Sequence, residues 1–590
     1  MSRQPYHGST RALVIAFDVG TTFSGVSYSV LDPGAVPEIR TVTRFPSQDQ
    51  VGGDSKIPTI VYYDREDKVV AVGAEAVREG IQGVAEEGGW VKAEWFKLHL
   101  RPAQMAAGLA DQESQLPCLP PNKTAVQIFA DFLRYLRDCT KQYIQETEAN
   151  GESLWESLEG SIHYVITHPN GWEGYQQSQL RSSAVLAGLI PESEEGNSRV
   201  SFVTEGEASL HFCVLNGLAE TVTTDGNAIL IVDAGGGTID LSAYRHVAEK
   251  QEFEETIAPQ CYFQGSVFVT TRAQEHLKSL LEGSKFADDV EHIVQRFDKR
   301  TKLAFRDDTQ VQFIQFGSVR ENDPSLDIRS GQLKLKGSTV AEFFEPSISC
   351  IQAAIGKACT ESQHPISTVI LVGGFAASDW LYMKLEERLK EKGLKLWRPD
   401  RHVNKAVSDG GVSFYLDNLV KARVSKAMYG VTCYVTYNPK NPEHEQRKDK
   451  IEVHETTGET ILWDAFDTIL PKNQRVTETQ EFRRGYSFIF KTQEEKVELK
   501  EEIIRYDGTL DKPLWIEKDS SDFVNVCSVV AEVVAPEYKK QVNPSTSEPY
   551  WELDIDIVVL FGLTELKAQV CWKENGIEQR SPATIIFHEQ

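Results

Sequence analysis

The feature that most constrains this chain is a pattern that occurs twice: an apolar run, an aspartate, a turn rich in glycine or threonine, and a second apolar run. Residues 12–28 read ALVIAFDVGTTFSGVSY, and residues 229–244 read ILIVDAGGGTIDLSAY. A short apolar run of this kind suits a buried strand, so each copy predicts two strands joined by a tight turn. Two such hairpins in one chain favour two related halves that hold one ligand between them.

The turns of both copies carry groups that suit a phosphate ligand. Glycine lets backbone N–H groups approach a phosphate closely, and a threonine hydroxyl adds a donor. Asp18 and Asp233 end the first strand of each copy, and a carboxylate there suits water bound to Mg²⁺ better than phosphate itself. A plain hairpin turn without a ligand is the alternative. The candidate phosphate-binding residues are Gly20, Thr21, Thr22, Gly235, Gly236, Gly237 and Thr238.

Composition narrows the class of protein. The chain has 590 residues, of which 41% are apolar and 25% charged, so we expect a globular protein with three or more compact units. Its net charge of −25 disfavours nucleic acid and anionic membranes as partners. The polar start of the chain predicts no secretory signal, and nine cysteines without CxxC spacing favour a reducing compartment. We therefore expect a cytoplasmic protein, with the nucleus as the alternative location.

A third motif gives the chain a family resemblance. Residues 369–381 read VILVGGFAASDWL, an apolar run followed by two glycines. In order and spacing, the three motifs resemble those of the actin-like ATPase superfamily, and within it the seventy-kilodalton heat-shock protein family. DVGTTFSG and DAGGGTID resemble the two phosphate motifs, and the third segment resembles the adenosine motif. The resemblance covers residues 11–428. It implies an α/β fold of two duplicated lobes with ribonuclease-H-like halves, and ATP or ADP with Mg²⁺ as cofactors.

The resemblance also implies three catalytic residues. Lys97 best matches a family lysine that projects toward the phosphates, and Lys92 matches it second best; a solvated helix lysine is the alternative. Glu205 matches a carboxylate that orients water near the metal, and only its position in the resemblance prefers it to Glu207. The helix dipole alone would favour a glutamate in a first turn. Asp240 would orient water and metal ligands together with Glu205. Asp18 and Asp233 would hold the metal through water.

Further positions match the nucleoside side of the family site. Asp298 and Lys302 match an acid and a base that face the ribose and the adenine, and a surface pair spaced i,i+4 is the alternative. Ala377 stands where the family usually has an arginine that stacks on adenine. The candidate nucleoside-binding residues are Gly265, Asp298, Lys302, Gly373, Gly374 and Asn404.

The predicted domains follow from the same comparison and from strand patterns. ATPase lobe I is expected over residues 11–227 and lobe II over 228–428, with residues 263–335 as an inserted helical subdomain. Segments with alternating or β-branched residues then predict a β-rich C-terminal domain over residues 431–590. This arrangement resembles a divergent, short-tailed branch of the family. Residues 148–160, rich in Gly, Glu and Ser, are expected to form a loop.

Three functions stay open. The first is an ATP-binding, chaperone-like protein with weak Mg-dependent ATPase activity, in which positioning and charge stabilisation drive γ-phosphoryl transfer to water. The second is a nucleotide-binding regulatory scaffold, which Ala377 and the lack of an acidic-leucine interdomain linker favour over a full chaperone cycle. The third is a small-molecule kinase, for which no motif supplies a base or a sugar pocket. The resemblance implies protein or peptide clients and a nucleotide-exchange factor as partners of a monomer, with no nucleic acid and no membrane.

Overall fold

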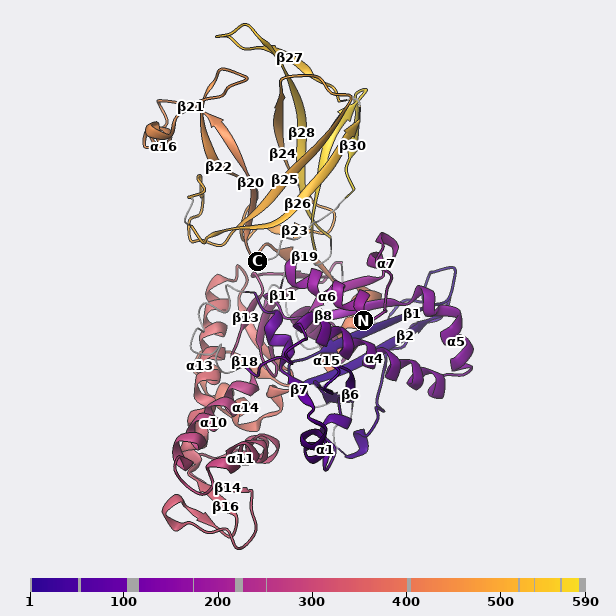
Figure 1. The fold of residues 1–590 in the computed structure, drawn as a ribbon, viewed down its shortest axis with the longest axis vertical. Helices are drawn as coiled ribbons and strands as arrows, with labels where there is room; N and C mark the ends of the chain where they lie inside the picture. The colour runs from indigo at the N-terminus through magenta and orange to yellow at the C-terminus, as the bar shows by residue number, and fades with distance from the viewer. Residues whose placement is uncertain are drawn as a thin grey trace. The chain divides into compact units, whose positions relative to one another are not determined.

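The computed structural model forms two compact units (Figure 1), one comprising Met1–Trp172 and Gln179–Val420, the other Glu173–Ser178 and Lys421–Gln590. They are described separately below. The residues that the structure describes are 3–50, 55–102, 116–172, 174–217, 227–250, 252–399, 405–517, 520–534, 536–562 and 565–582.

The first lobe of the first unit is built on a sheet with the strand order β3-β2-β1-β8-β9, and β4 pairs with β2. Strands β1 and β2 form an antiparallel hairpin, whereas β8 runs parallel to β1 and β9 runs parallel to β8. The first predicted hairpin therefore lies inside a mixed sheet. The strands are β1 (Ala12–Val19), β2 (Phe23–Leu31), β3 (Arg40–Thr41), β4 (Lys56–Pro58), β8 (His163–His168) and β9 (Val200–Thr204). A smaller sheet contains β6 (Val69–Val72), β5 (Ile60–Tyr63) and β7 (Val91–Glu94).

The second lobe repeats this plan. Its strand order is β18-β17-β10-β11-β12, and β13 pairs with β11. Strands β10 and β11 form the second antiparallel hairpin, β17 runs parallel to β10, and β18 runs parallel to β17. Both lobes thus combine one hairpin with two parallel strands on the same side of it. The strands are β10 (Ala228–Ala234), β11 (Ile239–Val247), β12 (Glu252–Glu255), β13 (Gln260–Tyr262), β17 (Ile366–Val372) and β18 (Lys395–Trp397).

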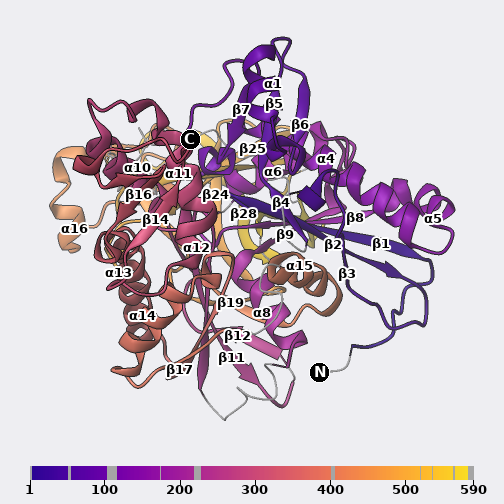
Figure 2. The same cartoon turned by 90° about the horizontal axis from the view of Figure 1, so that it is seen from below.

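Each lobe has its own apolar core, and two helices pack against each other at very close range. The core of the first lobe draws on β1, β8 and α4, and that of the second on β10, β17 and α13. Helices α8 and α15 lie side by side (Figure 2), with Gly410 against the backbone of Ala208. The helices are α1 (Ile81–Gly88), α4 (Ala125–Thr147), α5 (Gly151–Leu158), α6 (Gly174–Leu186), α7 (Glu194–Ser198), α8 (Glu205–Leu215), α10 (Ser266–Leu281), α11 (Val290–Arg296), α12 (Lys302–Ala304), α13 (Gly337–Glu361), α14 (Asp379–Lys390) and α15 (Ala406–Asp417).

Two local expectations need correction. Residues 148–160 are not a loop, because α5 lies within them and buries Leu154, Trp155 and Leu158 in the core of the first lobe. Three apolar residues at helical spacing outweigh the loop-like composition around them. The inserted segment of the second lobe contains a small sheet of β14 (Gln312–Gln315), β16 (Gln332–Leu335) and β15 (Ile328–Arg329) as well as helices. A π-helical stretch, η6 (Phe297–Thr301), separates α11 from α12.

The second unit is a sandwich of two antiparallel sheets. One has the order β21-β22-β20-β25-β26, and the other has β24-β28-β29-β30 with β27 on β28. Residues of both sheets, such as Val529 and Ile557, share one core, as expected for sheets packed face to face. The α/β class with a β-rich C-terminal part is confirmed. The elements are β19 (Val420–Val424), β20 (Met428–Thr436), α16 (Pro442–Glu445), β21 (Glu452–Val453), β22 (Thr460–Leu470), β23 (Arg475–Thr477), β24 (Glu481–Phe490), β25 (Lys496–Tyr506), β26 (Phe523–Val534), β27 (Lys539–Val542), β28 (Pro549–Gly562), β29 (Glu565–Glu574) and β30 (Ile577–Arg580).

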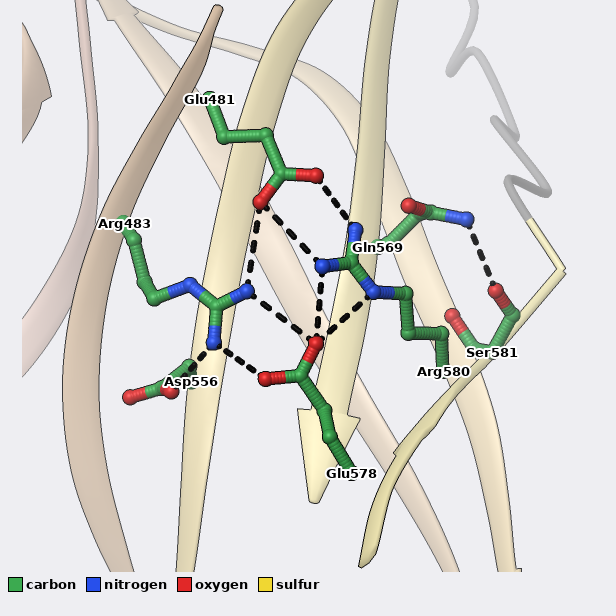
Figure 3. A network of polar contacts seen from close by, with 7 residues as sticks. All are labelled: Glu481, Arg483, Asp556, Gln569, Glu578, Arg580 and Ser581. Carbon is green, nitrogen blue, oxygen red and sulfur yellow. Dashed lines mark hydrogen bonds and ion pairs between the residues drawn. The ribbon is translucent and has the colours of Figure 1, made fainter.

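Charged side chains cross the outer face of the second sheet of the sandwich (Figure 3). Arg483 on β24 contacts Asp556 on β28 at 3.0 Å and Glu578 on β30 at 2.7 Å. Arg580 contacts Glu578 and Glu481, so two arginines are shared among three carboxylates.

Among the helices of the described residues, none is long and apolar enough to cross a membrane.

The close packing of α8 and α15 predicts a large effect of one methyl group. A Cβ atom at Gly410 would lie 1.8 Å from the carbonyl oxygen of Ala208, so Gly410→Ala must push the two helices apart. We expect a loss of about 1–3 kcal/mol in the free energy of unfolding, measured by urea denaturation. The matched control is Gly356→Ala in α13, where the new Cβ meets only Lys392 Nζ at 3.5 Å. It should stabilise the protein by about 0.5–1 kcal/mol, and equal effects of the two variants would contradict the packing argument.

The network on the sandwich predicts a pH dependence. Hydrogen bonds from Arg483 and then Arg580 lower the pKa of Glu578 from 4.5 to about 2. A carboxyl whose pKa is lower in the folded state stabilises that state above its unfolded pKa, and the contribution is lost as the pH falls toward the folded value. Glu578→Gln should therefore lower the melting temperature of the second unit at neutral pH, and the difference from wild type should shrink between pH 4.5 and pH 2. Calorimetry over this range tests it. Glu548→Gln, at an exposed glutamate for which the described residues offer no ion pair, is the control; a difference that does not depend on pH would count against the network.

Candidate functional site

The two hairpins bring their aspartates to equivalent positions. In the first hairpin Asp18 on β1 lies opposite Gly25 on β2, and in the second Asp233 on β10 lies opposite Asp240 on β11. The three carboxylates are buried. Asp18, Asp233 and Asp240 all lie beside a turn, because the two apolar strands of each hairpin stay paired until the turn begins. The two copies of the sequence pattern therefore place their carboxylates at matching ends of two sheets.

The two turns meet. A Cβ atom at Gly236 would lie 2.4 Å from Thr22 Oγ1, and one at Gly237 would lie 2.4 Å from Thr21 Oγ1. The second turn is closed by the N–H of Gly235, which donates to the carbonyl of Thr238 at 2.8 Å. Only glycine leaves room for this contact, so the glycines and threonines predicted to bind phosphate form one group in space.

The start of α10 holds the second turn from the other side. The amides of Gly265, Ser266 and Val267 donate to the carbonyls of residues 237, 235 and 236, at 3.2, 3.1 and 2.9 Å. A Cβ atom at Gly265 would lie 2.4 Å from the carbonyl oxygen of Gly236. The predicted residue Gly265 thus belongs to the same group as the turn.

Asp233 and Asp240 sit in a strongly negative environment. Burial, and then the charges of Glu205 and Asp240, raise the pKa of Asp233 to about 8 against a hydrogen bond from Ser209 Oγ at 2.8 Å. Burial and then the charge of Glu205 raise the pKa of Asp240 to about 7, although the backbone N–H of Asn170 donates to its Oδ1 at 2.7 Å. Several carboxylates in one buried place need a cation nearby to stay ionised.

A buried lysine, Lys97, and a half-buried one, Lys56, supply part of that positive charge. Lys97 Nζ is 2.5 Å from Glu205 Oε1 and lies 5.6 Å from the ring centroid of Trp172. Lys56 Nζ is 2.7 Å from Asp18 Oδ2. Lys92, the second sequence candidate, instead pairs with Glu94 on its own strand β7. Of the two predicted lysines, only Lys97 is paired with a carboxylate of this group.

The donor set fits a hard divalent cation held through water. Asp18, Glu205, Asp233 and Asp240 against Lys56 and Lys97 leave two negative charges in excess when all groups are ionised. Oxygen ligands and bridging waters are what Mg²⁺ prefers. Among the described residues, no three His, Cys, Asp or Glu side chains converge closely enough to hold a metal directly.

The nucleoside candidates lie around α10 and the end of β17. Thr270 on α10 donates to Asp298 Oδ1 at 2.5 Å, and Lys302 Nζ contacts both Asp298 and the Thr270 hydroxyl. Burial raises the pKa of Asp298, but Lys302 outweighs it and the pKa is lowered. The i,i+4 pair named as the alternative is therefore formed, and it is anchored to the helix that holds the second turn.

Two glycines follow β17, and they differ in their surroundings. Gly373 has φ +91°, and a Cβ atom there would lie 2.3 Å from Asp233 Oδ1, so this glycine lies directly on the carboxylate. A Cβ atom at Gly374 would meet nothing within 4 Å, which leaves open space beside the backbone. Asn404, the last candidate, lies outside the described residues.

Sequence reasoning missed three residues of the site: Lys56, Asn170 and Ser209. Ser209 could have been suspected, since it follows Glu205 by one helical turn on a helix that is buried all round. Asn170 contacts Asp240 across 70 residues of sequence, and Lys56 contacts Asp18 from a separate strand. For these two no local signal exists, because only the pairing of distant segments brings them in.

Comparison with known proteins gives distant but long matches. No family model matches the chain. Heat shock 70 kDa protein 12A of Mus musculus is 23% identical over 562 residues, which cover 81% of this chain and 79% of that protein. Heat shock 70 kDa protein 12B of Homo sapiens is 22% identical over 569 residues, which cover 80% and 78%.

The Lys97–Glu205 pair predicts strong coupling in a double-mutant cycle. Lys97→Met leaves Glu205 buried beside Asp233 and Asp240, which should cost about 3–5 kcal/mol of stability. Adding Glu205→Gln removes that uncompensated charge, so the double variant should be far more stable than the sum of the single effects.

Urea denaturation of the four proteins measures this coupling. Lys92→Met with Glu94→Gln is the matched control, because both side chains are partly exposed and exposed pairs couple by less than about 1 kcal/mol. Additive effects at Lys97 and Glu205 would mean that the pair is not a unit.

Proposed function

We propose, on the premise that this chain is a distant relative of the seventy-kilodalton heat-shock proteins with their actin-like ATPase fold, that it binds ATP and ADP at the two hairpins and hydrolyses ATP slowly. One observation carries the proposal. The same strand, aspartate and turn are built twice, and the turns meet beside buried carboxylates that two lysines only partly neutralise. A ligand with phosphates and a bound cation uses both the donors of the turns and the excess negative charge.

Each part of the site has a task in this reaction. The hydroxyls of Thr21 and Thr22 and the N–H groups of the second turn would donate to phosphate oxygens. Asp233, with Asp18 only where Lys56 leaves it free, would hold Mg²⁺ through water, and the ion would supply positive charge for the phosphates. Lys97 is held by Glu205 and Trp172 in one place, so its ammonium would position the attacking water. Asp240 is the candidate acceptor of a hydrogen bond from that water.

The nucleoside part of the site favours weak selectivity for adenine. Ala377 ends the short helix η8 (Phe375–Ala377) and offers no side chain to stack on a base. The nearby guanidinium of Arg398 donates to the carbonyl of Ala376 at 2.9 Å and to Asp379 Oδ1 at 3.0 Å, and it lies over the ring of Tyr382. This arginine is already held by three partners. Adenine would therefore contribute less to affinity than the phosphates do.

Ala377 and the tight pairing of Lys97 support a second candidate, a nucleotide-binding scaffold with little hydrolysis. A lysine whose charge is already paired with a buried carboxylate stabilises the phosphates less, which gives a slow reaction. Partners of either form would be protein or peptide clients, contacted by the β-rich unit, and a nucleotide-exchange factor. We propose the cytoplasm as the location and a monomer as the working state, on composition and family relationship alone.

Calorimetric titration tests nucleotide binding. Wild type should bind ATP and ADP, and Asp233→Asn should weaken binding of the Mg²⁺ complex by about tenfold or more, or 1.4 kcal/mol. In EDTA the same variant should bind as well as wild type or better, because a repelling carboxylate is gone. Asp131→Asn is the control, since Asp131 is a paired acid of α4. Wild type that binds neither nucleotide at millimolar concentration would refute the proposal.

Single-turnover hydrolysis separates the two candidates. If the chain is a slow ATPase, its rate should fall by about tenfold or more in Lys97→Ala with little change in affinity. A wild-type rate no higher than that of Lys97→Ala, with binding intact, would identify the scaffold.

A further inference from the structure

Lys56 reaches the candidate site across an intervening strand. On β4 it lies opposite Gly25 of β2, and Gly25 lies opposite Asp18 of β1. Residues opposite each other in a sheet share a face, and neighbouring strands are about 4.8 Å apart. Lys56 and Asp18 are therefore two strands apart in one row, and a side chain between them would crowd the lysine stem that joins them.

Glycine at the middle position avoids that crowding. The place that a Cβ atom of Gly25 would take is 3.3 Å from Lys56 Cγ and 3.7 Å from its Cε. The lysine stem therefore lies over Gly25, and Nζ ends 2.7 Å from Asp18 Oδ2. Lys56, Gly25 and Asp18 form a row in which each position is needed for the ion pair.

The ammonium of Lys56 also interacts electrostatically with the other carboxylates of the site. Burial lowers its pKa, but attraction to Asp18, then Asp233 and Glu205, outweighs burial and the pKa is raised. The geometry alone places the Lys56 ammonium on Asp18, 2.7 Å from Oδ2. Its charge lies on one of the two aspartates that were predicted from sequence to hold Mg²⁺ through water.

We propose that Lys56 is a built-in cation of this site, whose ammonium takes the place beside Asp18 that metal-bound water would otherwise take. Nucleotide binding then depends only partly on a divalent cation. The two lysines divide the carboxylates between them: Lys56 takes Asp18 and Lys97 takes Glu205. Asp233 and Asp240 lie outside these two ion pairs, so one divalent ion still finds a place. The ligand would be a nucleotide whose phosphates meet Lys56 and the metal together.

Metal binding without nucleotide tests the first half of this inference. Mn²⁺ affinity is measured from the electron paramagnetic resonance signal of the free ion. Lys56→Met leaves Asp18 unpaired and should raise Mn²⁺ affinity by about tenfold or more. Lys334→Met, which removes an exposed lysine of β16, should change nothing. An unchanged Mn²⁺ affinity in Lys56→Met would overturn the inference.

A second variant covers the case in which Lys56→Met does not fold. Gly25→Ala keeps the lysine but puts a methyl group against its stem, so the ammonium should be held less well on Asp18. We expect Mn²⁺ affinity to rise in this variant as well, by less than in Lys56→Met. An affinity equal to that of wild type would mean that the row is not needed for the ion pair.

Nucleotide affinity with and without metal tests the second half, which rests on the proposed function. The loss on Lys56→Met should be larger by about tenfold in EDTA than in Mg²⁺, because only the metal can replace the missing charge. Equal losses in both buffers would reduce Lys56 to a structural residue and refute the inference. If wild type binds no nucleotide, the proposed function fails, and the Mn²⁺ measurement still decides whether Lys56 occupies the cation's place.

Discussion

The ends of the two hairpins depend on the pairing of buried charge. An isolated carboxylate is costly in an apolar interior, and four of them close together are tolerated only with cations among them. Lys56 and Lys97 supply two, from a strand and a short helix that are distant in sequence from the aspartates. The surroundings support this arrangement: Trp172 lies against Lys97, and Gly25 gives Lys56 its path. Removing either lysine leaves a carboxylate without its ion-pair partner.

Duplication explains why the charges meet at all. Each lobe has its own core and its own hairpin with two parallel strands, so each can place a turn and an aspartate reliably. The two turns then touch through glycines and threonines, and the amides at the start of α10 hold the second turn in place. The contact of α8 with α15 at Gly410 is a similar case, in which two backbones approach because no side chain stands between them. Small residues at a few contacts thus fix the geometry of a large unit.

The β-rich unit uses different physics. Its stability comes from two sheets that share one apolar core, and its charged residues lie on the outer face, where they form the network around Arg483 and Glu578. Solvent screens such exposed charges, so each ion pair adds little to folding stability and several must act together as a network. In the candidate site, by contrast, burial removes this screening, and the pKa values of Asp233 and Asp240 are raised.

The sequence by itself determined the hairpins, their aspartates and glycines, the α/β class and the β-rich tail. These follow from local patterns, because an apolar run, an acid and a glycine turn lie within a few residues of each other. It preferred Lys97 to Lys92 only through the family resemblance, and it misjudged residues 148–160, where burial of Trp155 outweighs composition. Only the tertiary structure revealed Lys56 and Asn170. Lys56 reaches Asp18 through two successive strand pairings, and strand register between distant segments is set by the packing of the whole sheet.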